Sequence, residues 1–234
     1  MKKTVIVCVL TLILGLLIGI YIDELPCEKT DTALQATMVP EQQDMLSAAD
    51  VLPSVSPSDD VSEYNPDKST SLLKVACDAL EYIKAGDYES LAEMIHPVDG
   101  VIFVPYSTVN LSGNLRFSAK EIASLDTDTA KYTWGITNGE GKPIELTMAE
   151  YFKTYVFNAD YTQAPMIGIN QILQYGNSLE NVEEIFPDAD FVEFHFPGLQ
   201  EEYDGYDWCS LKLVFEMYNS QPKIVAIIHS QWTI

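Results

Sequence analysis

Residues 210–218 read Ser-Leu-Lys-Leu-Val-Phe-Glu-Met-Tyr, and residues 223–232 read Lys-Ile-Val-Ala-Ile-Ile-His-Ser-Gln-Trp. Both runs are rich in β-branched and aromatic residues, and residues 219–222 (Asn-Ser-Gln-Pro) between them are typical of a turn. In the first run apolar side chains alternate with Lys212 and Glu216, which predicts a strand with one buried face. The second run is apolar on both faces over most of its length, as in a central strand. We therefore expect a C-terminal hairpin on which the core is built.

The acidic composition of the chain limits the classes of molecule that it is expected to bind. The chain has 234 residues with 13 basic and 35 acidic side chains, a formal charge of −22. From residue 70 onward nine basic and 24 acidic side chains remain, a formal charge of −15. This balance argues against binding of nucleic acid or of anionic lipid surfaces, both of which need Lys and Arg.

The N-terminus predicts a membrane anchor. Lys2 and Lys3 precede residues 4–22, nineteen residues without a charge, which span roughly 28 Å as a helix. No small-residue cleavage site follows, so residues 1–22 are expected to be an uncleaved signal anchor. The basic residues lie before the span and acidic residues after it, which orients the rest of the chain outside the cytoplasm. The pattern Gly15-x-x-x-Gly19 also allows close helix pairing within the membrane.

Residues 23–69 have a different composition, with many acidic, Ser, Thr and Pro residues and few apolar ones. Such a segment buries too little apolar surface to offset the entropy of ordering its backbone. We expect an acidic, disordered linker that separates the anchor from a domain formed by residues 70–234.

Local patterns predict the elements of this domain. Helical spacing of apolar residues follows Ser69 or Thr70 and stops at Gly86, and Asp87 begins a second, shorter helix. Capping boxes begin brief helices at Ser118 and Thr147. Further elements are expected by residue range: strands at 101–104 and 191–196, a hairpin of 131–137 with 143–146, and a short helix after Asn177 or Ser178. Helices first and strand pairs last favour an α+β fold with N-terminal helices packed on a curved antiparallel sheet.

Two resemblances agree with this interpretation. The order helix, Ala85-Gly86-Asp87-Tyr88, short helix, His96-Pro97 and then strands resembles the NTF2-like (cystatin-like cone) superfamily, in which helices fill a bent sheet around a pocket. The words Tyr132-x-Trp134-Gly135, His195-Phe196-Pro197-Gly198 and Trp232-Thr233-Ile234, among others, resemble a family of exported Gram-positive bacterial proteins of uncharacterised function. Neither resemblance implies catalytic residues.

Four cysteines, Cys8, Cys27, Cys77 and Cys209, show no C-x-x-C spacing, which argues against a zinc ribbon or a thioredoxin-like site. Cys77 and Cys209 are either a disulfide pair in an extracytoplasmic domain or two buried free thiols.

Candidate chemistry is sparse. Nucleophile-elbow, HExxH and phosphate-loop motifs are missing from the sequence, so no cofactor is expected. By strand alternation Glu193 and His195 share one face, and convergence with His229 would supply a general base or zinc ligands.

The acidic stretch Glu201, Glu202, Asp204 and Asp207 is a second candidate site, for Ca²⁺, although we favour a solvated loop, because runs of charge are usually exposed. The interpretation we favour is a membrane-tethered, non-catalytic domain that binds a ligand or a partner protein. The alternative is a small extracytoplasmic hydrolase or lyase that uses Glu193, His195 and His229.

Overall fold

A computed structural model describes residues 66–233. The predicted anchor, most of the predicted linker and the G-x-x-x-G pattern lie outside the described residues. The helical elements, in chain order, are α2 (Pro66–Ala85), α3 (Tyr88–Met94), α4 (Ala119–Ala123), α5 (Met148–Tyr151), the π-helical turn η1 (Phe152–Val156), the 3₁₀ turn η2 (Tyr161–Gln163), α6 (Val182–Ile185) and the 3₁₀ turn η3 (Glu201–Tyr203).

The strands form one large and one small sheet. They are β1 (Val101–Val104), β2 (Leu115–Phe117), β3 (Lys131–Ile136), β4 (Pro143–Thr147), β5 (Met166–Ile169), β6 (Asp190–Phe196), β7 (Cys209–Tyr218) and β8 (Gln221–Gln231). The large sheet has the order β2-β1-β8-β7-β6-β5, and β3 pairs with β4. All neighbours in the large sheet are antiparallel except β1 and β8, which are parallel.

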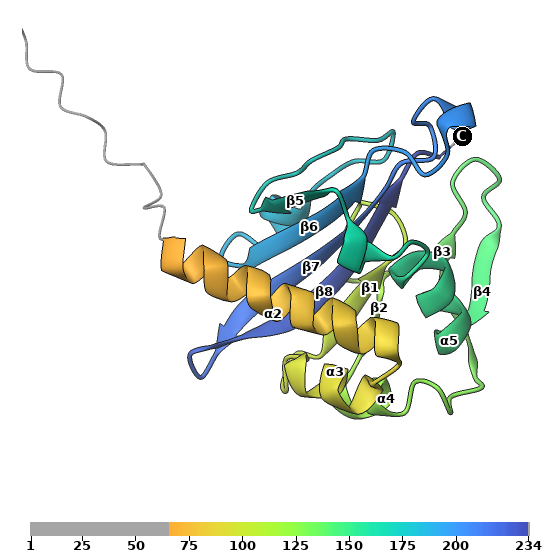
Figure 1. The fold of residues 1–234 in the computed structure, drawn as a ribbon. Helices are drawn as coiled ribbons and strands as arrows, with labels where there is room; N and C mark the ends of the chain where they lie inside the picture. Colours follow the sequence, from red (N-terminus) through yellow and green to blue (C-terminus); the bar gives the residue numbers. More distant parts are fainter. Residues whose placement is uncertain (1–65, 234) are drawn as a thin grey trace, which may run out of the picture. The chain divides into compact units, whose positions relative to one another are not determined.

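The predicted α+β fold, with helices on a curved and mainly antiparallel sheet, is confirmed. Figure 1 shows α2 crossing the face of strands β6 to β8, with α3, α4 and α5 on the same side. The C-terminal hairpin is also as expected, and β8 is a central strand between β1 and β7. Its two turn residues, Asn219 and Ser220, both have positive φ, as a tight two-residue hairpin turn requires.

The helix starts that the sequence predicts at Asp87, Ser118 and Thr147 are also present in the structure. The Asp87 carboxylate accepts from the Ser90 N–H at the start of α3. Ser118 and Thr147 form complete capping boxes at α4 and α5. Two boundaries differ from expectation: α2 begins at Pro66, so its first turn lies in the stretch assigned to the linker, and α6 follows Asn181 instead of Ser178.

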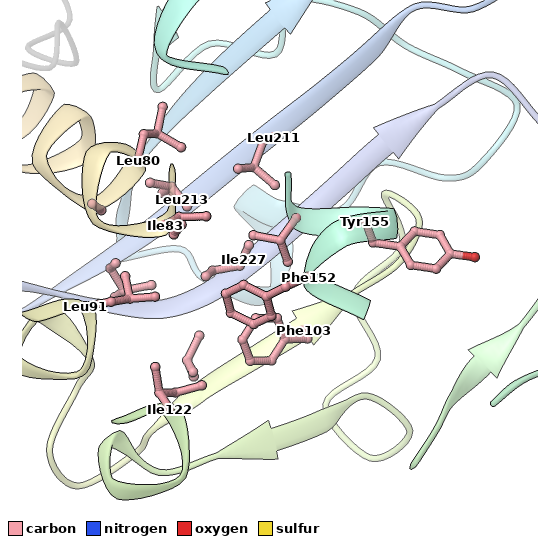
Figure 2. Close-up of a cluster of buried hydrophobic side chains, with 14 of the residues drawn as sticks. Leu80, Ile83, Leu91, Phe103, Ile122, Phe152, Tyr155, Leu211, Leu213 and Ile227 are labelled. Atoms are coloured by element: carbon pink, nitrogen blue, oxygen red, sulfur yellow. The ribbon is translucent and has the colours of Figure 1, made fainter. Parts of the chain in front are cut away.

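Each face of the large sheet has its own apolar core. On the helix-covered face, Phe103, Leu211, Leu213 and Ile227 pack against α2, α3, α4 and η1 (Figure 2). On the opposite face, here called the outer face, a second cluster includes Val214 and residues contributed by the segment 172–189. That segment connects β5 to β6 and covers the outer face of the sheet.

The prediction that β7 has one buried face is therefore wrong. Lys212 points to the outer face, where it is opposite Ile228 of β8 and Glu193 of β6, and it is completely buried. Alternation placed it on the polar face correctly, but a covering segment distant in sequence removes that face from solvent.

Candidate functional site

The register of the sheet separates the three candidate catalytic residues. Leu211 of β7 is opposite Phe194 of β6 and opposite His229 of β8. Directly paired residues share a face, so His229 and Phe194 both lie on the helix-covered face with Leu211. Glu193 and His195, which flank Phe194 along β6, therefore lie on the outer face. The structure does not bring the three residues together.

Glu193 belongs to a buried ionic cluster on the outer face. The Lys212 ammonium lies 2.7 Å from Glu180 Oε2 and 3.7 Å from Glu193 Oε2, and it donates to Ser230 Oγ at 3.1 Å. The side chains of all three charged residues are at most 3% exposed. Two carboxylates around one ammonium form a structural anchor between the sheet and the covering segment that carries Glu180.

His195 is engaged with its neighbours on the same face. Its Nδ1 lies 2.8 Å from Ser210 Oγ, and its ring packs against Trp208. Burial lowers the pKa of His195, an effect that a backbone hydrogen bond at Cys209 opposes and that Lys212 reinforces. The imidazole is therefore neutral at pH 7 and has a packing role.

His229 lies at the aromatic end of the helix-covered face. Its Nδ1–H donates to the Pro105 carbonyl oxygen at 3.1 Å, and the buried Nε2 has no hydrogen-bond partner among the described residues. Burial lowers the pKa of His229 to about 4, so this imidazole is neutral at pH 7. The edge of its ring meets Tyr155 at a centroid distance of 5.6 Å.

Tyr155 connects His229 to a stack of aromatic rings. Tyr155 stacks on Tyr151, and Tyr151 stacks on Trp134 with centroids 3.8 Å apart. In Figure 2 the Tyr155 hydroxyl points away from the hydrophobic cluster, and it lies 3.5 Å from the Tyr106 hydroxyl. Burial, and then the contact with Tyr106, raises the pKa of Tyr155 above its ordinary value, so the Tyr155 hydroxyl remains protonated at neutral pH.

A cavity of about 320 Å³ lies next to this stack. Its walls come from the connection after β1, from β3 with the turn that follows it, and from the segment before α6. The lining residues are Pro105, Tyr106, Thr108, Asn110, Gly113, Asn114, Trp134, Gly135, Ile136, Asn138 and Ser178. Every lining side chain is uncharged at neutral pH.

Several amide groups at this cavity remain available for a ligand. Asn138 Nδ2 donates to Ser178 Oγ at 2.9 Å, and Asn110 Oδ1 accepts backbone N–H groups from its own loop. Within residues 66–233, Asn138 Oδ1 and the Nδ2 groups of Asn110 and Asn114 have no hydrogen-bond partner. These residues could not be predicted as a site from the sequence, because nothing local shows that the loops carrying Tyr106, Asn110, Asn114 and Asn138 meet.

The acidic stretch at η3 forms a loop. Asp204 has a positive φ of 48°, and Asp207 Oδ2 accepts the Gln200 N–H at 2.8 Å. Among the described residues, the set of His, Cys, Asp and Glu whose ligand atoms lie within 4.8 Å of one another is His96, Asp99 and Glu216. Glu201, Glu202, Asp204 and Asp207 do not form such a set.

Cys77 and Cys209 are free thiols in the structure, Cys77 half-buried and Cys209 buried. Within residues 66–233 no helix combines the length and the apolar character that a bilayer crossing requires.

The similar proteins of known structure have low sequence identity to this chain. No family model and no curated protein matches the chain. One similar solved structure is an NTF-2-like protein of unknown function from Shewanella oneidensis MR-1, with 11% identity, a TM-score of 0.32, and coverage of 71% of this chain and 99% of that one. Another is a putative calcium/calmodulin-dependent protein kinase II association domain from Xanthomonas campestris, with 10% identity, a TM-score of 0.29, and coverage of 72% and 89%. At these identities and TM-scores neither likeness carries an argument.

Proposed function

We propose that residues 66–233 form a non-catalytic binding domain for an uncharged polar ligand with several hydroxyl or amide groups. The observation that carries this proposal is the composition of the 320 Å³ cavity, where asparagine amides, hydroxyl groups and the Tyr106 ring meet without a charged side chain. Amide groups both donate and accept hydrogen bonds, which suits a ligand whose polar groups do the same.

The surrounding electrostatics support the same class of ligand. The Pro105 carbonyl and Tyr106 connect the cavity to His229 and Tyr155, both of which are neutral at pH 7. A domain with a formal charge of −15 repels anions, and the cavity offers no carboxylate to a cation. The alternative, a hydrolase or lyase, lacks an assembled acid–base set because His229 faces away from Glu193 and His195.

We further propose that residues 1–22 anchor the chain in a membrane with this domain outside the cytoplasm. The support is the sequence alone: nineteen uncharged residues, preceded by lysines and followed by acidic residues. Alkaline carbonate extraction should leave the full-length chain in the membrane fraction. Protease added to intact cells stripped of their wall should digest the domain. Release by carbonate, or protection from the protease, would contradict the proposal.

The binding proposal is tested by filling the cavity. Ile136 is 63% exposed and lines the cavity, so Ile136→Trp adds bulk there without disturbing the core. Leu111, 52% exposed and outside the lining, supplies the matched control Leu111→Trp. The probes are neutral mono- and disaccharides in saturation-transfer NMR, with glucuronate and glucosamine as charged comparators.

We expect saccharide signals with wild-type protein and Leu111→Trp, and their loss with Ile136→Trp. Equal signals from all three proteins would place binding elsewhere, and a preference for glucuronate or glucosamine would refute the uncharged class. Absence of any signal from the neutral panel would refute the saccharide-like ligand.

A further inference from the structure

His96, Asp99 and Glu216 meet on the outer face near the tip of the β7–β8 hairpin. His96 and Asp99 belong to the turn between α3 and β1, and Glu216 belongs to β7. Their ligand atoms all lie within 4.8 Å of one another. This group is separate from the 320 Å³ cavity, since none of the three residues lines it.

The backbone holds His96 in a fixed position. Its N–H donates to the Ile224 carbonyl at 3.0 Å, which extends the parallel pairing beside β8, and its own carbonyl accepts the Gly100 N–H at 2.9 Å. The imidazole packs edge to face against Tyr218 with ring centroids 5.1 Å apart. The ring is buried, whereas the side chain of Asp99 is 55% exposed, so the group is rigid at the imidazole and open to solvent at the carboxylate.

The spacing of the donor atoms fits a metal ion. His96 Nδ1 lies 3.0 Å from Asp99 Oδ2. Two ligands each about 2.1 Å from a divalent metal, at angles near 90–109°, are separated by about 3.0–3.4 Å. Binding at Nδ1 displaces the Asp99 N–H, which now donates to this nitrogen at 2.9 Å. That lost hydrogen bond makes the expected affinity moderate.

The neighbouring cations do not neutralise the two carboxylates. Lys223, opposite Glu216 in the register, directs its ammonium to the Glu93 carbonyl at 2.7 Å. The Arg116 guanidinium donates to the backbone carbonyl of Asp99. Glu216 forms no ion pair with any residue in the described part of the chain, so its partly buried carboxylate remains available.

We propose that His96, Asp99 and Glu216 bind one divalent transition-metal ion, with water in the remaining coordination positions. One imidazole and two carboxylates are donors shared by Mn²⁺- and Zn²⁺-type sites. Tyr218, which packs on His96, also lines a cavity of about 510 Å³ together with Pro97, so a metal here borders a space large enough for a small ligand.

The test uses Mn²⁺ as the probe because, unlike Zn²⁺, it has little affinity for the cysteine thiols of the chain. Full-length protein is purified in detergent, stripped with a chelator and titrated with Mn²⁺, and the free ion is followed by EPR. The variants are Asp99→Asn and Glu216→Gln, with Glu145→Gln on the exposed side of β4 as the matched control. Pulsed EPR of the bound ion reports a nitrogen ligand, which is checked with His96→Gln.

We expect one Mn²⁺ per chain, affinity at least about tenfold weaker in Asp99→Asn and Glu216→Gln, and no change in Glu145→Gln. The nitrogen coupling should vanish in His96→Gln, and Zn²⁺ should displace Mn²⁺ from the wild-type protein. The proposal is refuted by the absence of saturable binding, by wild-type affinity in Glu216→Gln, or by bound Mn²⁺ without nitrogen coupling. Binding that survives in Glu216→Gln would place the ion at another site.

Discussion

Replacing Lys212 by Met tests whether the buried ionic cluster holds the covering segment on the sheet. The substitution keeps the aliphatic length of the side chain but leaves the carboxylates of Glu180 and Glu193 buried without their cation. Loss of one partner from a buried pair costs about 3–5 kcal/mol. For a domain of this size about 1 kcal/mol corresponds to about 2–4 °C, so the melting temperature should fall by about 6–20 °C.

The two carboxylates should respond differently when the lysine is absent. Glu193 is fixed in the central part of β6, whereas Glu180 lies in the connecting segment, and we expect that segment to yield more easily than the strand once Lys212 is gone. Adding Glu193→Gln to Lys212→Met should therefore recover more stability than adding Glu180→Gln. A double-mutant cycle compares the free energies of unfolding of these double variants with those of the corresponding single variants. It separates the interaction energy of Lys212 with each glutamate.

Urea unfolding followed by tryptophan fluorescence is a suitable assay. The three tryptophans, Trp134, Trp208 and Trp232, all lie in the described domain, so the signal reports on that domain within the full-length protein. A loss below about 1 kcal/mol for Lys212→Met, the range of exposed ion pairs, would refute the reasoning. It would mean that water reaches the cluster.

The remaining predictions concern pH, backbone conformation and capping. Burial lowers the pKa of His229 from 6.5 to about 4, so between these pH values the unfolded chain binds a proton that the folded chain excludes. The free energy of unfolding should therefore fall by about 3 kcal/mol as the pH drops from 6.5 to 4. In urea titrations His229→Gln should make the free energy of unfolding less dependent on pH. Gly100→Ala should cost about 2–5 kcal/mol, because φ is +65° and a Cβ would overlap the Phe117 carbonyl oxygen. Gly86→Ala, with φ of +68° and open space around its Cβ, should cost only about 1 kcal/mol, and similar melting temperatures for the two variants would contradict this account. Ser118→Ala should lose about 1 kcal/mol with the α4 capping box, measured against Ser118→Asp, which keeps a cap.

Sequence patterns predicted the elements whose signals are local. The capping boxes at Ser118 and Thr147 and the C-terminal hairpin all depend on neighbours within a few residues, and each is present in the structure. The short edge strands β2 and β5 were missed, since three or four residues contain too little alternation to indicate a strand. The parallel pairing of β1 with β8 was missed as well, because no local pattern encodes it.

The candidate sites were harder to predict than the fold for the same reason. Alternation correctly paired Glu193 with His195, but the side of the sheet taken by His229 depends on how β7 aligns with both neighbours. The cavity beside Tyr106 is assembled from two connections and strand β3, and the group at Glu216 joins a turn to a strand about 120 residues further along the chain. Such convergence follows from tertiary structure alone.

The parallel pairing of β1 with β8 also constrains how the domain is made. Ile102 pairs with Ala226, so the edge of β1 is covered only after a strand more than a hundred residues further along the chain has been made. Contacts this far apart in sequence slow folding and expose unpaired strand edges in the interim. A nascent domain emerging from a ribosome or a translocon would therefore stay open until β8 has been made, and deletion of β8 should abolish the native state altogether instead of trimming it.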